Sequence, residues 1–138
     1  MISKKVFLDT AYAIALAVAA DAHHERAAEL AELLESEQTQ LITTRAVWLE
    51  IGNALSKRRY RAAAVELLSA LTQDPQVEII TPTQAVFQQA FELFRDRPDK
   101  EWGLVDCLSF VVMQERGLAE ALTTDEHFEQ AGFRALLR

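Results

Sequence analysis

The chain contains little cysteine, glycine, proline or positive charge. Its 138 residues include one cysteine, Cys107, so the chain can form no internal disulfide and lacks the ligands of a cysteine-based zinc site. Four glycines and three prolines argue against a collagen-like, disordered or turn-rich all-β chain. Fourteen Lys and Arg against 21 Asp and Glu exclude a polycation that binds nucleic acid by bulk charge. We expect one domain over residues 1–138 in a reducing compartment, the cytoplasm.

The apolar stretch near the N-terminus has two interpretations. Lys4 and Lys5 precede an apolar run over 11–20, an arrangement that also occurs in signal peptides. Asp9 interrupts the apolar sequence, however, and a run of ten residues is too short to span a bilayer. The same residues fit a buried strand followed directly by a helix. We expect that arrangement, and no membrane association.

Short apolar runs alternate with segments of helical periodicity along the chain. Strands are expected at 6–8, 41–43, 77–80, 121–123 and, more weakly, 133–137. Helices are expected from residue 10, at 22–34, from residue 44 to about 55, and at 62–71, 81–94, 104–114 and 126–130. This alternation favours an α/β fold in which helices cover both faces of a parallel sheet through right-handed crossovers.

Four acidic residues stand out by their positions. Asp9 and Asp125 each follow a predicted strand, at the sheet edge where open parallel sheets bind ligands. Glu50 lies beside the apolar stripe of its helix, whereas Asp106 lies in a helix that is apolar almost all round, with no Lys or Arg over 102–115. Burying such a carboxylate costs on the order of several kcal/mol unless a cation compensates it. Oxygen ligands without cysteine or suitably spaced histidine favour Mg²⁺ or Mn²⁺.

Each acid also has a purely structural interpretation. Asp9 and Asp125 are suited to capping the helices that follow them. Glu50 taken alone is typical of a solvated helix residue. Asp106 is the hardest of the four to explain in this way, because its neighbours in the sequence are apolar.

The four acids lie in four sequence blocks that follow one another along nearly the whole chain. The blocks are Phe7-Leu8-Asp9-Thr10, Trp48-Leu49-Glu50-Ile51-Gly52-Asn53-Ala54-Leu55, Trp102-Gly103-Leu104-Val105-Asp106-Cys107-Leu108-Ser109-Phe110 and Leu122-Thr123-Thr124-Asp125-Glu126-His127-Phe128. Together they resemble the PIN domain family and, within it, the VapC-type ribonuclease toxins of toxin–antitoxin pairs. The resemblance implies a three-layer α/β/α fold with a central, mainly parallel sheet of about five strands.

The same resemblance implies a metal-dependent endoribonuclease that cleaves single-stranded RNA with one or two Mg²⁺ or Mn²⁺ ions. The residues that match the family's catalytic, metal-binding acids are Asp9, Glu50, Asp106 and Asp125. Neighbouring side chains expected to orient carboxylates or waters are Thr10, Asn53, Ser109 and Thr124. Many close relatives carry Ser and Thr where Gly103 and Val105 stand, which leaves the surroundings of Asp106 open.

The resemblance further implies a homodimer and a cognate antitoxin protein that inhibits the nuclease. The sequence supports these partners only through Trp48, Phe87, Phe91 and Phe94, whose side chains are more often core than interface.

A basic segment after the Glu50 helix is the candidate RNA-binding surface. It contains Lys57, Arg58, Arg59 and Arg61, with Tyr60 among them. Its alternative interpretation is a solvated helix end whose cations interact favourably with the C-terminal dipole. The chain's histidines, His23, His24 and His127, are expected to be surface or capping residues without a catalytic role.

Two other functions compete with the nuclease. A PIN-like module with a silent site would act through protein binding alone, and it would take up no Mg²⁺ or Mn²⁺. An aspartyl-phosphate phosphatase is suggested by Asp9-Thr10 after a strand, but that chemistry normally needs a second acid two positions after the nucleophile, and residue 11 is Ala.

Overall fold

The computed structural model describes residues 2–138, which form seven helices and five strands. The strands are β1 (Lys5–Leu8), β2 (Gln40–Thr44), β3 (Val77–Ile80), β4 (Glu120–Leu122) and β5 (Arg134–Ala135). The helices are α1 (Thr10–Ala17), α2 (His24–Ser36), α3 (Arg45–Ala54), α4 (Arg58–Gln73), α5 (Gln84–Asp96), α6 (Leu104–Arg116) and α7 (Glu126–Gln130).

The five strands form one sheet in the order β3-β2-β1-β4-β5, and every neighbouring pair is parallel. The chain builds outward from β1 to β3, then crosses back to add β4 and β5 on the other side of β1. The strand order therefore reverses between β1 and β4. In open α/β sheets, ligands bind at the carboxyl ends of the strands at such a reversal.

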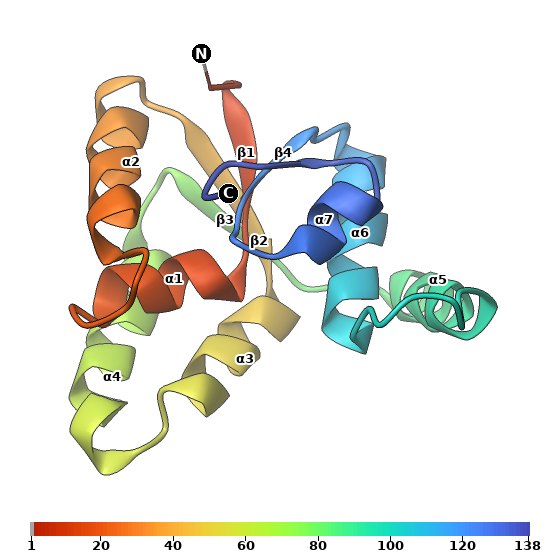
Figure 1. The fold of residues 1–138 in the computed structure, drawn as a ribbon, viewed down its shortest axis with the longest axis horizontal. Helices are drawn as coiled ribbons and strands as arrows, with labels where there is room; N and C mark the ends of the chain where they lie inside the picture. Colours follow the sequence, from red (N-terminus) through yellow and green to blue (C-terminus); the bar gives the residue numbers. More distant parts are fainter. Residues whose placement is uncertain (1) are drawn as a thin grey trace.

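Helices cover both sides of the sheet (Figure 1). Helices α1, α2 and α4 lie on one side, α5 and α6 lie on the other, and α3 extends from the carboxyl end of β2. This arrangement confirms the predicted three-layer α/β/α fold. Within residues 2–138, no helix has the length and apolar character needed to cross a membrane.

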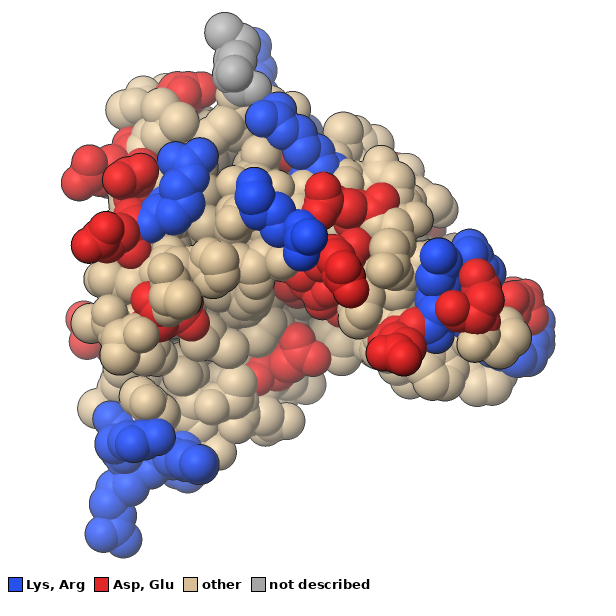
Figure 2. Space-filling model, in the orientation of Figure 1, with Lys and Arg blue, Asp and Glu red and all other residues tan. Residues whose placement is uncertain are grey.

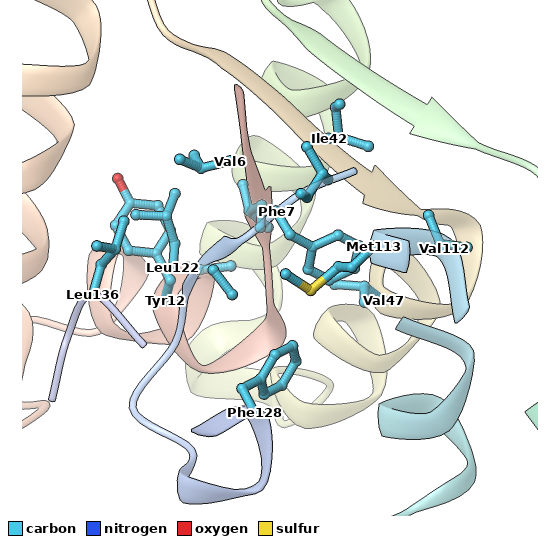
Figure 3. Packing of buried hydrophobic residues seen from close by; sticks show 14 of the residues in the cluster. Val6, Phe7, Tyr12, Ile42, Val47, Val112, Met113, Leu122, Phe128 and Leu136 are labelled. Carbon is cyan, nitrogen blue, oxygen red and sulfur yellow. The ribbon is translucent and has the colours of Figure 1, made fainter. Parts of the chain in front are cut away.

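The core joins the central strand to the helices on its two sides. Phe7 of β1 is fully buried, and its ring lies 6.3 Å from that of Phe128 of α7. Phe110 of α6 meets the Phe128 ring edge-on at 5.0 Å. Figure 3 shows Phe7, Met113 and Val47 converging from β1, α6 and α3. This packing fixes the ends of β1 and β4 relative to the first turns of α6 and α7.

Local signals at the helix ends agree with the predicted elements. The Thr44 and Thr83 hydroxyls each accept the backbone N–H of a residue three positions later, at 3.2 Å, and so cap α3 and α5. Gly117 ends α6 with φ of 66°, a left-handed conformation that favours glycine. Asp74 and Pro75 end α4 as expected.

The beginning of α4 differs from the prediction. The helix begins at Arg58 rather than residue 62, so Arg58, Arg59 and Arg61 lie in its first turn. The basic residues thus follow the C-terminal end of α3, whose dipole favours them, and begin α4, whose dipole opposes them. The alternative interpretation of this segment as a solvated helix end stays open.

Candidate functional site

Asp9 is a buried carboxylate at the carboxyl end of the central strand. It directly follows β1, its residue is 6% exposed, and its Oδ2 accepts a hydrogen bond from the Thr123 hydroxyl at 2.8 Å. Asp9 occupies the N-cap position of α1, yet its side chain makes no capping hydrogen bond. The capping interpretation therefore does not account for this acid.

The electrostatic surroundings of Asp9 disfavour its ionised form. Burial raises the pKa of Asp9 to about 7. The hydrogen bond from Thr123 lowers this pKa, whereas the nearby charges of Asp106 and Glu50 raise it further. No Lys or Arg side chain within residues 2–138 forms an ion pair with Asp9. The folded protein thus holds a carboxylate whose charge its own cations leave uncompensated.

Glu50 reaches the same place from α3. Its Oε1 accepts a hydrogen bond from the hydroxyl of Thr10, the first residue of α1. This contact joins helices that follow two neighbouring strands, β1 and β2, and it orients the Glu50 carboxylate beside Asp9. Because Glu50 is only partly buried, it lies at the open rim of the acidic cluster. Thr10 has the carboxylate-orienting contact expected from the sequence.

Asp106 lies in the first turn of α6 and not deep in that helix. Its Oδ2 accepts the backbone N–H of Gly103 at 3.0 Å, and its side chain is 19% exposed. Burial raises the pKa of Asp106, opposed by the Gly103 amide and increased by the charge of Asp125. The helix N-terminus also favours a negative charge here. The Gly103 backbone amide thus holds the Asp106 carboxylate in place.

Asp125 lies in the loop after β4 and caps the short helix α7. Its Oδ1 accepts the backbone N–H of His127 at 2.9 Å, which confirms the expected cap. Its own N–H donates to the Thr123 hydroxyl at 3.0 Å, and that hydroxyl donates in turn to Asp9. Thr123 therefore links two of the acids.

The sequence predicted Thr124, and not Thr123, as the hydroxyl that orients the acids. Thr123 is fully buried, whereas the hydrogen bond that the structure gives Thr124 is made by its carbonyl, which accepts from Arg138 at 3.3 Å. Both threonines stand between β4 and Asp125, and strand periodicity alone does not decide which side chain turns inward at the end of a three-residue strand.

His127 also belongs to the cluster, although sequence analysis gave it no role. Its Nδ1 lies 3.2 Å from Asp106 Oδ2 and 3.3 Å from Asp125 Oδ1. No local signal in the sequence marks this contact, because it joins α7 to a residue on another helix.

The other two expected neighbours lack a defined contact with the acids. Asn53 is exposed near the end of α3. Ser109 is fully buried in α6, and its Oγ is the one buried side-chain polar atom in residues 2–138 without a hydrogen-bond partner. An orphaned hydroxyl one turn after Asp106 is unusual in a packed protein.

One cluster of basic side chains stands apart on the surface (Figure 2). It lies at the end of the molecule where α3 turns into α4 in Figure 1, whereas elsewhere on the face shown acidic and basic side chains lie close together. Lys57, Arg58, Arg59 and Arg61, which we call the basic corner, are all exposed there. The Arg61 guanidinium donates to the Ser56 carbonyl at 2.8 Å, and Arg59 lies over the Tyr60 ring at 4.7 Å.

The model of the PIN domain family matches residues 6–134. The chain belongs to the PIN domain family. Two proteins named 23S rRNA-specific endonuclease VapC20, from Mycobacterium tuberculosis strains CDC 1551 / Oshkosh and ATCC 25618 / H37Rv, are each 32% identical over 129 residues, which cover 93% of this chain and 95% of theirs. The crystal structure of M. tuberculosis VapC20, described as a Sarcin-Ricin loop cleaving toxin, matches with a TM-score of 0.82 at 30% identity, over 93% of this chain and 95% of that one.

These similarities confirm the VapC-like PIN resemblance that the four blocks predicted. The donor set of this PIN chain fits a divalent cation. Asp9, Glu50, Asp106 and Asp125 offer hard oxygen ligands from four segments, and their mutual repulsion falls when a cation lies among them. One ligand atom each from Asp106, Asp125 and His127 lie within 4.8 Å of one another, as ligands of a single ion do.

Proposed function

We propose that this PIN-domain protein is an endoribonuclease toxin of the VapC type that requires Mg²⁺ or Mn²⁺. The observation that carries the proposal is the set of acids that meets at the reversal of strand order without a compensating Lys or Arg. Asp9, Glu50, Asp106 and Asp125 are proposed as metal ligands and catalytic residues, within a single nuclease domain over residues 1–138. The 32% identity to RNA-cleaving VapC20 over almost the whole chain supports this reaction.

The acids fall into two groups in the proposed reaction. The buried Asp9 and the partly buried Asp106 and Asp125 would hold the cation, while Glu50 at the open rim would face the RNA. The bound ion supplies positive charge that lowers the pKa of a water and neutralises charge on the phosphate. The hydroxyls of Thr10 and Thr123 keep the Glu50 and Asp9 carboxylates oriented.

RNA approach to an acidic protein requires positive charge away from the cluster. We assign this role to the basic corner, whose cations have no ion-pair partner within residues 2–138 and are placed against the dipole of α4. Exposed cations without an ion-pair partner are available to bind the phosphates of RNA.

We also propose that the protein is cytoplasmic, pairs with an antitoxin protein and forms a homodimer. Phe87, Phe91 and Phe94 of α5 support the dimer, because each is about half exposed and their spacing places them along one side of the helix. Trp48 does not belong to this surface. It is partly buried, stacks with Arg45 and donates its indole N–H to Thr72.

Cleavage of a defined RNA tests the proposed function. VapC20 is a 23S rRNA-specific endonuclease that cleaves the Sarcin-Ricin loop, so a synthetic hairpin of that loop and an unstructured RNA are the first substrates. We expect Mn²⁺-dependent cleavage by the wild-type protein, suppression by EDTA and loss of cleavage in Asp106→Asn. Glu115→Gln is the matched control, since Glu115 is an exposed acid on the same helix. Cleavage that persists in Asp106→Asn would remove this site from the reaction.

The silent-module alternative makes the opposite prediction. A protein that acts through partner binding alone takes up neither ion and cleaves neither RNA at any concentration tested, while its antitoxin complex forms normally.

A further inference from the structure

The imidazole of His127 occupies an unusual position between two acids. Its Nδ1 lies 3.2 Å from Asp106 Oδ2 and 3.3 Å from Asp125 Oδ1. The side chain is 24% exposed, so it lies at the entrance of the cluster and not in its core. This single ring nitrogen therefore faces two carboxylates that come from different parts of the fold.

Hydrogen bonding alone would give the two carboxylates a share in one Nδ1–H. Such a three-centre bond is weak here, because 3.2 and 3.3 Å are long for a charge-assisted hydrogen bond. A cation among the three groups satisfies all of them, because each contributes a lone pair to the same centre. The ligand atoms that these three residues offer lie within 4.8 Å of one another.

The backbone fixes the relative positions of the three groups. Asp125 accepts the backbone N–H of His127 at 2.9 Å, which ties the carboxylate to the residue that bears the imidazole. Asp106 accepts the Gly103 N–H at 3.0 Å through the same oxygen that faces His127. Both acids are thus held by backbone amides, and the imidazole needs only its own side-chain torsions to join them.

We propose that His127 is a direct metal ligand, which gives this site one nitrogen donor among its carboxylates. The proposal rests on the metal-dependent nuclease proposed above. It carries a consequence for metal choice: imidazole binds Mn²⁺ and later transition metals far better than it binds Mg²⁺, which prefers oxygen. The site should therefore discriminate in favour of Mn²⁺ more strongly than four carboxylates alone would do.

Spectroscopy of bound Mn²⁺ tests the coordination directly, without reference to activity. Electron spin-echo modulation of the full chain loaded with Mn²⁺ should show coupling to a directly bound nitrogen-14, replaced by the nitrogen-15 pattern when the histidines are labelled. His127→Asn should bind Mn²⁺ about tenfold more weakly in calorimetry and lose the nitrogen signal, with a smaller change for Mg²⁺. His23→Asn is the control, since His23 lies outside the cluster at the start of α2 and should retain both signal and affinity.

The possible results distinguish a failure of the His127 assignment from a failure of the proposed metal-dependent nuclease. Wild-type protein that binds Mn²⁺ and cleaves RNA without a nitrogen signal overturns the assignment of His127 alone. A nitrogen signal that persists in His127→Asn overturns it as well. Absence of Mn²⁺ binding overturns both the assignment and the metal-dependent nuclease. The wild-type spectrum decides the question even where His127→Asn folds poorly, and His127→Gln provides a second variant.

Discussion

Two buried carboxylates lie at opposite ends of the same sheet and are treated in opposite ways. Glu120 begins β4 and is 5% exposed, while Asp9 follows β1 and is 6% exposed. Glu120 accepts the Ser3 N–H at 2.7 Å and pairs with Arg134 at 3.1 Å. Burial alone would raise the pKa of Glu120, but these partners outweigh it and lower the pKa. At Asp9, by contrast, burial raises the pKa to about 7.

The difference separates a structural acid from a functional one. At the amino ends of the strands, the fold provides a backbone donor and a guanidinium, so the charge of Glu120 is satisfied within the chain. At the carboxyl ends, the charges of Asp106 and Glu50 act on Asp9, and no Lys or Arg within residues 2–138 forms an ion pair with it. A buried carboxylate that the chain's own cations leave uncompensated indicates a site whose partner comes from outside the chain.

The largest expected difference between the two acids is in catalysis. Asp9→Asn should lower the rate of Mn²⁺-dependent RNA cleavage by about 10³-fold or more, because it removes a buried metal ligand. Glu120→Gln should cleave at close to the wild-type rate. Single-turnover cleavage of one labelled RNA by both proteins measures the contrast, and equal losses in the two variants would abolish the distinction between the ends of the sheet.

The same substitution at Asp9 should stabilise the metal-free protein. Its folded pKa of about 7 exceeds the ordinary value of 3.8, so between these pH values the folded state keeps a proton that the unfolded state has lost. The free energy of unfolding therefore falls as pH rises from about 4 to 7. Asp9→Asn removes this cost, which amounts to about 4 kcal/mol at most above pH 7.

Urea unfolding in EDTA at several pH values measures the effect. The difference between Asp9→Asn and wild type should be near zero at pH 4, grow toward pH 7 and then level off. Added Mn²⁺ should stabilise the wild type and have much less effect on the variant. A variant that is less stable than wild type at pH 8 in EDTA would show that Asp9 serves the fold.

Glu120→Gln should have the opposite effect on stability. Its pKa is lowered in the folded state, so its contribution is present above the ordinary carboxyl pKa and is lost as pH falls through the folded value. We expect a loss of about 1 kcal/mol at pH 7, since Gln still accepts the Ser3 N–H but cannot pair ionically with the mostly exposed Arg134. Unfolding at pH 7 and pH 3 should show this loss shrinking at the lower pH.

The smallest effect is expected at the basic corner. Replacing Arg58 and Arg59 with Ala should lower RNA affinity a few-fold at moderate salt. It should also flatten the dependence of log Kd on log salt by about 1.4, because each arginine bound to a phosphate of single-stranded RNA contributes about 0.7 to that slope. Arg26→Ala, an exposed arginine on α2, should leave the slope unchanged. An identical slope in the double variant would remove the basic corner from the RNA interface.

Much of the fold was predictable because its signals are local. Val77–Ile80 is a strand with the predicted bounds, and Thr44, Thr83 and Gly117 mark helix ends through contacts within a few residues of themselves. The start of α4 was not predictable in this way. It depends on Lys57, which has no side-chain capping bond, so no local signal marks the first turn.

The acids of the candidate site were predictable, but their partners were less so. Asp9 and Asp125 follow strands, and parallel topology brings such ends to one edge of the sheet. The roles of Thr123 and His127 depend on which way side chains turn in a short loop and a single helical turn. Those directions follow from tertiary packing, chiefly of the buried Phe128, and no periodicity in the sequence encodes them.

Calorimetric titration of Mn²⁺ tests the contrast between the two acids most directly. The wild-type protein and Glu120→Gln should bind Mn²⁺ with the same Kd at pH 7.5, and Asp9→Asn should bind it at least about tenfold more weakly. Binding of equal strength in wild type and Asp9→Asn, or no binding by the wild type, would contradict the conclusion that the uncompensated acids form a metal site.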